Sequence, residues 1–101
     1  MGFSKPADIS EAVVLYQTEW CGYCGLAKRL LKSRSIDFAT IDVTGDPEAR
    51  DWLREASGQQ TVPQIFIGGE SVGGYMELAK LDRSGRLAEM LSSVQPPVSP
   101  S

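Results

Sequence analysis

The order of short apolar runs and amphipathic stretches constrains the fold of this chain more than any other feature. Four apolar runs predict strands, at residues 12–16, 36–43, 61–67 and 70–72. Helical spacing predicts helices from Gly22 onward, from Pro47 to a stop at Gly58, and over residues 75–91 with a break at Ser84-Gly85. Because a helix separates the first two strands they should be parallel, whereas Gly68-Gly69 suits a tight antiparallel hairpin. The pattern predicts an α/β fold in which about three to four helices flank a four-stranded mixed sheet.

Local signals also define the ends and the buried faces of the predicted helices. Asp46 is a good N-cap, Pro47 suits the first helical position, and Gly58 suits the C-terminal end of the second helix. Apolar spacing predicts the core-facing residues, which are Tyr23, Ala27, Leu30 and Leu31 in the first helix and Trp52, Leu53 and Ala56 in the second.

The length fits a single domain. The chain has 101 residues, and one core typically takes about 100 to 150. We place the domain at residues 10–92, after an N-terminal extension at residues 1–9. Residues 93–101 hold three prolines and little to bury, so we expect a disordered tail there.

Charge and hydropathy narrow the range of partners. Ten Lys and Arg against thirteen Asp and Glu give a net charge of −3, which disfavours binding to nucleic acid or to an anionic membrane. No apolar run approaches the roughly 20 residues of a membrane span, and residues 1–8 lack the apolar core of a signal peptide. We therefore expect a cytoplasmic protein with no nucleic-acid or membrane partner.

The sequence contains no histidine, and this excludes several kinds of catalyst. Ser-His-Asp triads, Cys-His proteases and His-ligated metal sites all need an imidazole. The two cysteines, Cys21 and Cys24, are too few for the disulfide framework of a small secreted scaffold. The chemistry left to this chain therefore centres on this pair.

Cys21 and Cys24 occupy the predicted junction between the first strand and the first helix. Unpaired N–H groups at a helix N-terminus stabilise a thiolate, which is the reactive form of cysteine. Cys21 should therefore attack a disulfide. Cys24 lies about one turn deeper, so its sulfur could attack the resulting mixed disulfide and release the partner.

Two other interpretations of the cysteine pair remain open at this stage. A free cysteine can simply be a small buried apolar residue. The pair could also be half of a zinc site, although structural zinc takes four ligands and the chain has no further Cys or His. The position at a strand-to-helix junction favours the redox interpretation.

Thr61-Val62-Pro63 is the second motif of interest. Pro63 could be an ordinary edge-strand proline. Alternatively, a cis Val62–Pro63 bond would present the backbone N–H and C=O of Val62 toward the cysteines, where an extended peptide could pair with them.

Gly73-Gly74 is the third motif, and a glycine pair can mark a turn and nothing more. Here it precedes a predicted helix, so a ligand could approach the backbone closely. The N–H groups of Tyr75 and Met76 would then point at it and suit a carboxylate.

Together these motifs closely resemble those of a dithiol glutaredoxin of the thioredoxin-like superfamily. The resemblance spans roughly residues 12–91 and rests on three segments in the same order and spacing: Trp20-Cys21-Gly22-Tyr23-Cys24, then residues 61–69 from Thr61-Val62-Pro63-Gln64 to Gly68-Gly69, then Val72-Gly73-Gly74-Tyr75. It implies a thioredoxin-like (glutaredoxin) fold. It also implies a glutathione-dependent oxidoreductase that reduces glutathione mixed disulfides and protein disulfides.

The resemblance also implies a role for individual residues. Cys21 would take the glutathionyl group and Cys24 would resolve it. The predicted substrate-binding residues are Tyr23 beside the sulfur, Thr61 and Val62 along the tripeptide, a cis Pro63, Gly74, Tyr75 and Met76 at the γ-glutamyl end, and Arg50 at the glycine carboxylate. The partners would be glutathione and glutathionylated or disulfide-bonded proteins, and the protein would be a monomer.

The chain departs from the family pattern at three positions. Thr18 stands where many members have Lys, and Met76 stands where a polar residue is common, so we expect weaker or altered glutathione binding. Gly22 replaces the common Pro, and some members with Gly there hold a 2Fe-2S cluster between two subunits, through the first cysteine (here Cys21) and external glutathione. A cluster-bound dimer is one alternative function, and a redoxin recharged by another thiol system is a second.

Overall fold

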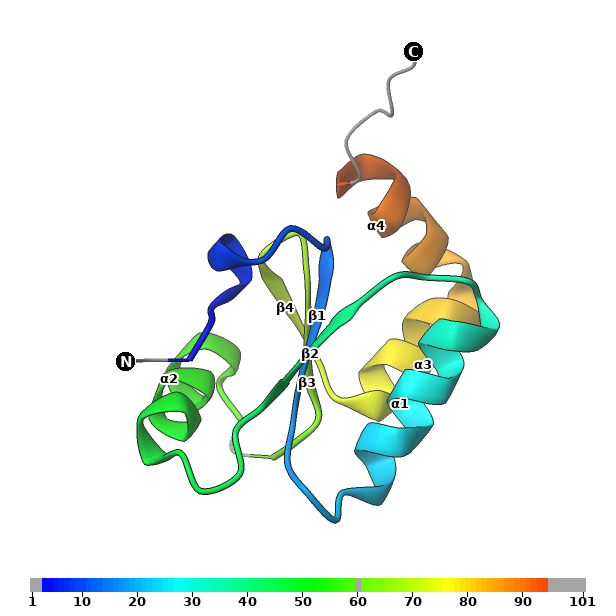
Figure 1. Cartoon of the computed structure of the whole chain (residues 1–101). Helices are drawn as coiled ribbons and strands as arrows, with labels where there is room; N and C mark the ends of the chain where they lie inside the picture. Colours follow the sequence, from blue (N-terminus) through cyan, green and yellow to red (C-terminus); the bar gives the residue numbers. More distant parts are fainter. Residues whose placement is uncertain (1–2, 60, 95–101) are drawn as a thin grey trace.

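The computed structural model describes residues 3–59 and 61–94 (Figure 1). A short 3-10 helix, η1 (Pro6–Asp8), precedes the main elements, which are β1 (Val13–Gln17), α1 (Gly22–Ser33), β2 (Ala39–Asp42), α2 (Pro47–Ser57), β3 (Gln64–Ile67), β4 (Glu70–Gly73), α3 (Tyr75–Ser84) and α4 (Arg86–Val94). Within these residues, no helix is long and apolar enough to cross a membrane. The predicted tail falls mostly outside the described residues.

The four strands form one mixed sheet in the order β2-β1-β3-β4. β1 is parallel to β2 and antiparallel to β3, and β3 is antiparallel to β4. Gly68 and Gly69 link β3 to β4 with φ of 60° and 84°, the positive values that a tight hairpin turn requires. The predicted mixed sheet, its parallel opening and its hairpin are therefore confirmed.

The predicted helix ends are confirmed as well. The Asp46 side chain accepts a hydrogen bond from the Ala49 N–H, Pro47 begins α2, and Gly58 ends it in the left-handed conformation. The predicted break at Ser84-Gly85 is the boundary between α3 and α4.

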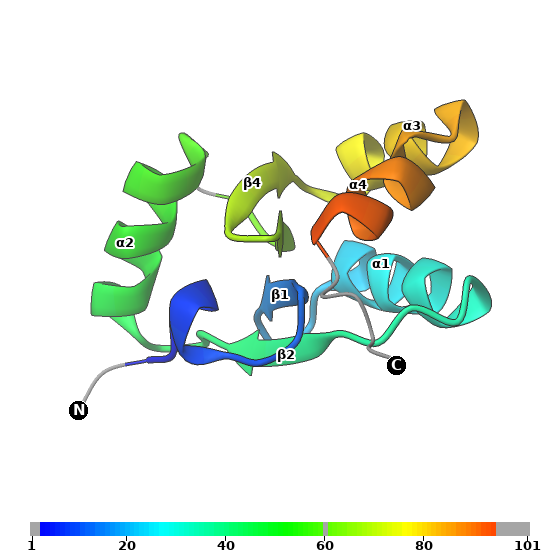
Figure 2. The same cartoon turned by 90° about the horizontal axis from the view of Figure 1, so that it is seen from above.

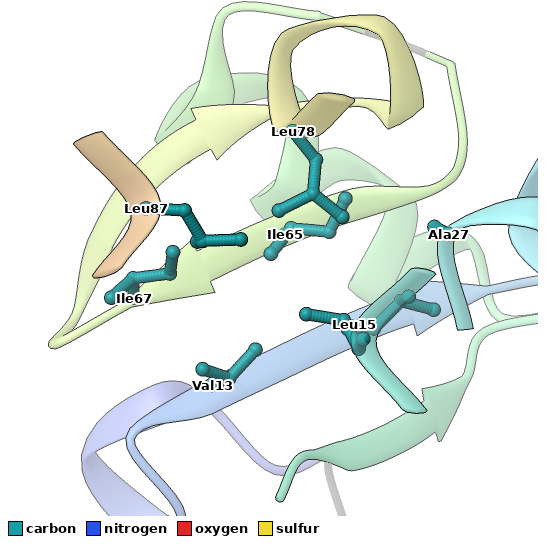
Figure 3. Close-up of a cluster of buried hydrophobic side chains, with 8 residues drawn as sticks. Val13, Leu15, Ala27, Ile65, Ile67, Leu78 and Leu87 are labelled. Carbon is teal, nitrogen blue, oxygen red and sulfur yellow. The ribbon is translucent and has the colours of Figure 1, made fainter. Parts of the chain in front are cut away.

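The helices cover the two faces of the sheet unequally. In Figures 1 and 2, α2 lies on one side of the sheet and α1, α3 and α4 lie on the other. Alternate residues of β1 serve the two sides: Val13 and Leu15 pack in one apolar cluster, and Val14 and Tyr16 in another. Figure 3 shows the first cluster, in which Ala27, Leu78 and Leu87 from the three helices meet Val13 and Leu15 of β1 and Ile65 and Ile67 of β3.

The prediction of core-facing residues is wrong at two positions. Tyr23 is 59% exposed, because it lies in the first turn of α1, where its ring faces Tyr75 (centroids 6.1 Å apart) and does not reach the core. Ala56 is exposed, because the buried face of α2 runs along Ala49 and Leu53, and Ala56 instead lines a surface pocket beside the N-terminal segment.

An ion pair joins the end of α1 to α3. Arg34, just after α1, donates from Nε and Nη2 to the two carboxylate oxygens of Asp82 in α3, both at 2.8 Å. These hydrogen bonds hold the pKa of Asp82 below its ordinary value. This bidentate pair links the end of α1 to α3 on the surface of the protein.

The segment predicted as an extension packs against the α2 side of the sheet (Figure 1). The Phe3 ring lies 5.4 Å from that of Trp52, and the Tyr16 hydroxyl donates a 2.7 Å hydrogen bond to the Ser4 carbonyl. Residues 3–9 therefore help to cover the second apolar cluster, which includes Tyr16 and Phe66.

Tyr16 should make stability fall at high pH. Burial, followed by the nearby Asp8 charge, raises the pKa of its hydroxyl well above the ordinary value. Below about pH 10 the phenol is neutral in both the folded and the unfolded chain, so Tyr16 makes its full contribution to the free energy of unfolding. Above about pH 10 the unfolded chain loses this proton while the folded chain keeps it, so stability should decline.

Urea unfolding of Tyr16→Phe should show about 1 kcal/mol less stability than wild type at pH 7, and a shallower decline toward pH 11. Parallel pH profiles would contradict this assignment.

Candidate active site

Cys21 and Cys24 lie at the N-terminus of α1 and are joined by a disulfide. Cys21 is the N-cap residue, and its Sγ accepts a hydrogen bond from the Cys24 N–H at 3.2 Å. It is partly exposed, whereas Cys24 is only 2% exposed. The predicted division between an accessible attacking sulfur and a deeper resolving sulfur therefore fits the structure, and the N–H groups of the first turn would stabilise a Cys21 thiolate.

The loop before Cys21 is anchored to the end of β2. The Glu19 N–H donates to Thr44 Oγ1, and the Thr44 N–H donates to Asp42 Oδ1, both at 2.8 Å. The hydrogen bonds from Thr44, with a smaller contribution from the Lys28 charge, hold the pKa of Asp42 below its ordinary value.

Trp20 links this loop to the cysteine in a rare conformation. Its φ is 61°, in the left-handed region that bulky residues seldom adopt, and its side chain is 96% exposed. The large apolar ring therefore lies in solvent beside the redox disulfide.

The Val62–Pro63 peptide bond is cis, as the resemblance implied. The Val62 carbonyl oxygen lies 3.6 Å from Cys21 Sγ, so a reduced Cys21 could donate its S–H to it. Pro63 precedes β3, which pairs with strands on both sides. The edge-strand interpretation of this proline is therefore wrong.

A pocket of about 300 Å³ adjoins this bond. Its lining comprises Tyr23, Gln59, Thr61, Val62, Pro63, Gly74, Tyr75, Met76 and Glu77. The structure thus brings together every predicted substrate-binding residue except Arg50, which is partly buried on α2 and does not line the pocket. The proposed contacts of all these residues with a ligand stay predictions.

Gln59 and Glu77 also line this pocket, although the sequence motifs do not predict them. Glu77 Oε1 accepts a 2.9 Å hydrogen bond from the Gly74 N–H, which caps α3. An acidic residue three positions after an N-cap is a recognisable capping signal, so Glu77 could have been found. Gln59 carries no such signal, because only the folding of its loop brings it to the pocket.

The described residues contain no group of three or more Cys, Asp or Glu side chains placed to hold a metal ion. The two sulfurs are bonded to each other. This arrangement supports the redox interpretation of the pair over half of a zinc site.

Comparisons with known proteins agree with this geometry. The family model described as Glutaredoxin matches residues 13–72. The chain is 47% identical over 81 residues to a glutaredoxin of Pseudomonas aeruginosa, covering 80% of this chain and 96% of that protein. It is 39% identical over 79 residues to glutaredoxin 3 of Escherichia coli, covering 78% and 95%.

Solved structures give the same result. A buckwheat glutaredoxin–glutathione complex superposes with a TM-score of 0.77 at 33% identity, covering 84% of this chain and 80% of that one. The solution structure of glutaredoxin from Brucella melitensis has a TM-score of 0.75 at 38% identity, covering 85% and 94%.

Proposed function

The chain belongs to the glutaredoxin family and is a thiol–disulfide oxidoreductase with a thioredoxin-like fold, and from this premise we propose that glutathione is the thiol that it uses. Its substrates would be glutathione mixed disulfides and protein disulfides. We place its activity in the cytoplasm, where thiol systems keep cysteines reduced.

The proposed cycle needs only the two cysteines and glutathione. The Cys21 thiolate attacks the glutathione sulfur of a mixed disulfide, a Cys21–glutathione disulfide forms, and the substrate thiol leaves with a proton. A second glutathione thiolate then attacks the glutathione sulfur on Cys21, which releases glutathione disulfide and restores Cys21. With a protein disulfide, the Cys21 thiolate attacks one sulfur of the substrate, forms a mixed disulfide with it and frees the other sulfur as a thiol. Cys24 then attacks the sulfur of Cys21, releases the reduced partner and leaves the Cys21–Cys24 disulfide, which two glutathiones reduce to two thiols as they form glutathione disulfide.

The observation that carries this proposal is the pocket lined by Val62, whose carbonyl oxygen lies 3.6 Å from Cys21 Sγ. A tripeptide joined to Cys21 would lie along the loop that holds Val62 and pair with its backbone. Its γ-glutamyl carboxylate would reach the N-terminus of α3 at Tyr75 and Met76, where helix N–H groups favour an anion. Arg50 lies outside the pocket, so a contact with the glycine carboxylate would need the ligand to extend over α2. The superposed buckwheat structure is itself a glutathione complex.

One assay tests the proposal directly. Turnover of a glutathione mixed disulfide is measured with glutathione and glutathione reductase, and in parallel with thioredoxin and its reductase. We expect turnover that depends on glutathione. Recharging of the disulfide by the thioredoxin system alone would instead identify the redoxin alternative.

A 2Fe-2S cluster remains an alternative proposal. Because the described residues form no metal site within one chain, a cluster would need Cys21 from two copies and two external thiolates. Anaerobic reconstitution with iron, sulfide and glutathione tests this. A coloured dimer would support it, and a colourless monomer would exclude it.

A further inference from the structure

Gln64 is an unusual residue in the interior of this fold. Among the described residues it is the one polar side chain that is as fully buried as the apolar core. It begins β3 directly after the cis peptide bond and pairs with Tyr16 of β1. Because paired residues point to the same face of a sheet, its amide lies on the α2 side, beneath the loop that precedes β3.

The Gln64 amide is committed to that loop. Nε2 donates to the Thr61 carbonyl at 2.8 Å and to Gln59 Oε1 at 2.9 Å, and it lies 3.5 Å from Thr61 Oγ1. These acceptors fix the orientation of the amide, because a flipped amide would place oxygen against oxygen. Gln64 Oε1 has no hydrogen-bond partner among the described residues. The side chain thus holds the loop while leaving its own acceptor unsatisfied, which is destabilising in itself.

The loop that Gln64 holds forms one wall of the pocket. Gln59, Thr61 and Val62 line it, and the Val62 carbonyl lies 3.6 Å from Cys21 Sγ. Gln64 itself does not line the pocket. Any effect on a ligand must therefore act through the position of the loop.

We propose that Gln64 is a positioning residue, whose amide holds Thr61 and Val62 in the conformation that binds glutathione opposite Cys21. This inference rests on the proposed function. A preordered loop lowers the entropy cost of binding, so the effect should fall on binding and not on the chemical step at sulfur.

The test compares Gln64→Met with a matched control, Gln17→Met. Methionine has similar length and removes the unsatisfied acceptor together with the loop hydrogen bonds. Gln17 Oε1 is also buried without a partner, at the end of β1, and among the described residues no side-chain hydrogen bond joins Gln17 to the loop before β3. Gln17→Met therefore removes a similar acceptor and leaves the loop as it is.

We expect Gln64→Met to raise the KM for a glutathione mixed disulfide about tenfold, which corresponds to about 1.4 kcal/mol. The kcat, the melting temperature and the rate of Cys21 alkylation by iodoacetamide should stay near wild type. Gln17→Met should leave the KM, the kcat and the alkylation rate unchanged, and it should not lower the melting temperature, because it removes an unsatisfied buried acceptor.

Several outcomes would overturn the inference. An unchanged KM in Gln64→Met would show that the loop holds its position without the amide. A lower kcat and a lower melting temperature together with the higher KM would show that Gln64 stabilises the folded core in general and does not specifically position the loop. If the wild-type protein fails to turn over the mixed disulfide at all, the proposed function fails first and this inference fails with it.

Discussion

Cys21→Ser is expected to abolish disulfide exchange, with turnover of both glutathione mixed disulfides and protein disulfides falling by more than about a thousandfold. The helix N-terminus can stabilise a thiolate on Cys21, whereas a serine hydroxyl stays protonated at neutral pH and cannot attack sulfur. Cys21 is also the sulfur that solvent reaches, since Cys24 is only 2% exposed. The coupled assay with glutathione reductase measures the first loss, and reduction of a protein disulfide measures the second.

Cys24→Ser is the matched control for this prediction. It removes the deeper sulfur but keeps the N-cap position of Cys21 and the N–H that faces it, because that donor is a backbone group. Turnover of glutathione mixed disulfides should persist, since glutathione itself can release the Cys21 adduct. Reductions that need both thiols should be lost. Equal damage from the two substitutions would refute the separate roles of the two cysteines.

Features set by local chemistry could be predicted from the sequence. Asp46, Pro47 and Gly58 bound α2 because a side-chain cap, a fixed φ and a left-handed residue act within one turn of helix. The turn at Gly68-Gly69 follows from positive φ in the same way. The reactive position of Cys21 follows from the junction between β1 and α1.

Features that depend on distant contacts could not be predicted. The strand predicted over residues 36–43 begins only at Ala39. Ile36 and Phe38 lie in the loop before it, and their apolar side chains pack against the first core cluster. Likewise, residues 61–63 read as strand, but β3 begins after the cis bond. No local pattern predicts that Phe3 packs on Trp52, because 49 positions separate the two residues in the chain.

The lining of the pocket likewise includes residues that a sequence motif predicts and residues that only the fold brings there. The resemblance pointed to most of its lining, but Arg50 lies outside it, and Gln59 enters it. Gln64 follows the Thr61-Val62-Pro63 motif, but the motif predicts no role for its side chain. Its importance depends on hydrogen bonds to the loop before β3, which a linear pattern does not encode.

Gly73→Ala should have the largest effect on stability. Gly73 has φ of +107°, where residues with a side chain are strained. A Cβ there would also lie 2.9 Å from Glu77 Cγ and 3.1 Å from Glu77 Cβ. Relief of this clash would displace the Glu77 carboxylate from the Gly74 N–H and remove the cap of α3. We expect a loss of about 2 to 4 kcal/mol, seen as a melting temperature about 10 °C or more lower.

Gly25→Ala is the matched substitution that separates this local effect from glycine replacement in general. Gly25 lies within α1, and a Cβ built there meets nothing within 4 Å. Alanine should therefore stabilise α1 by about 0.5 to 1 kcal/mol, because it loses less backbone entropy than glycine on folding. Thermal unfolding of both variants should move in opposite directions from wild type. If Gly73→Ala melts at or above the temperature of Gly25→Ala, neither the φ of Gly73 nor its contact with Glu77 constrains the start of α3.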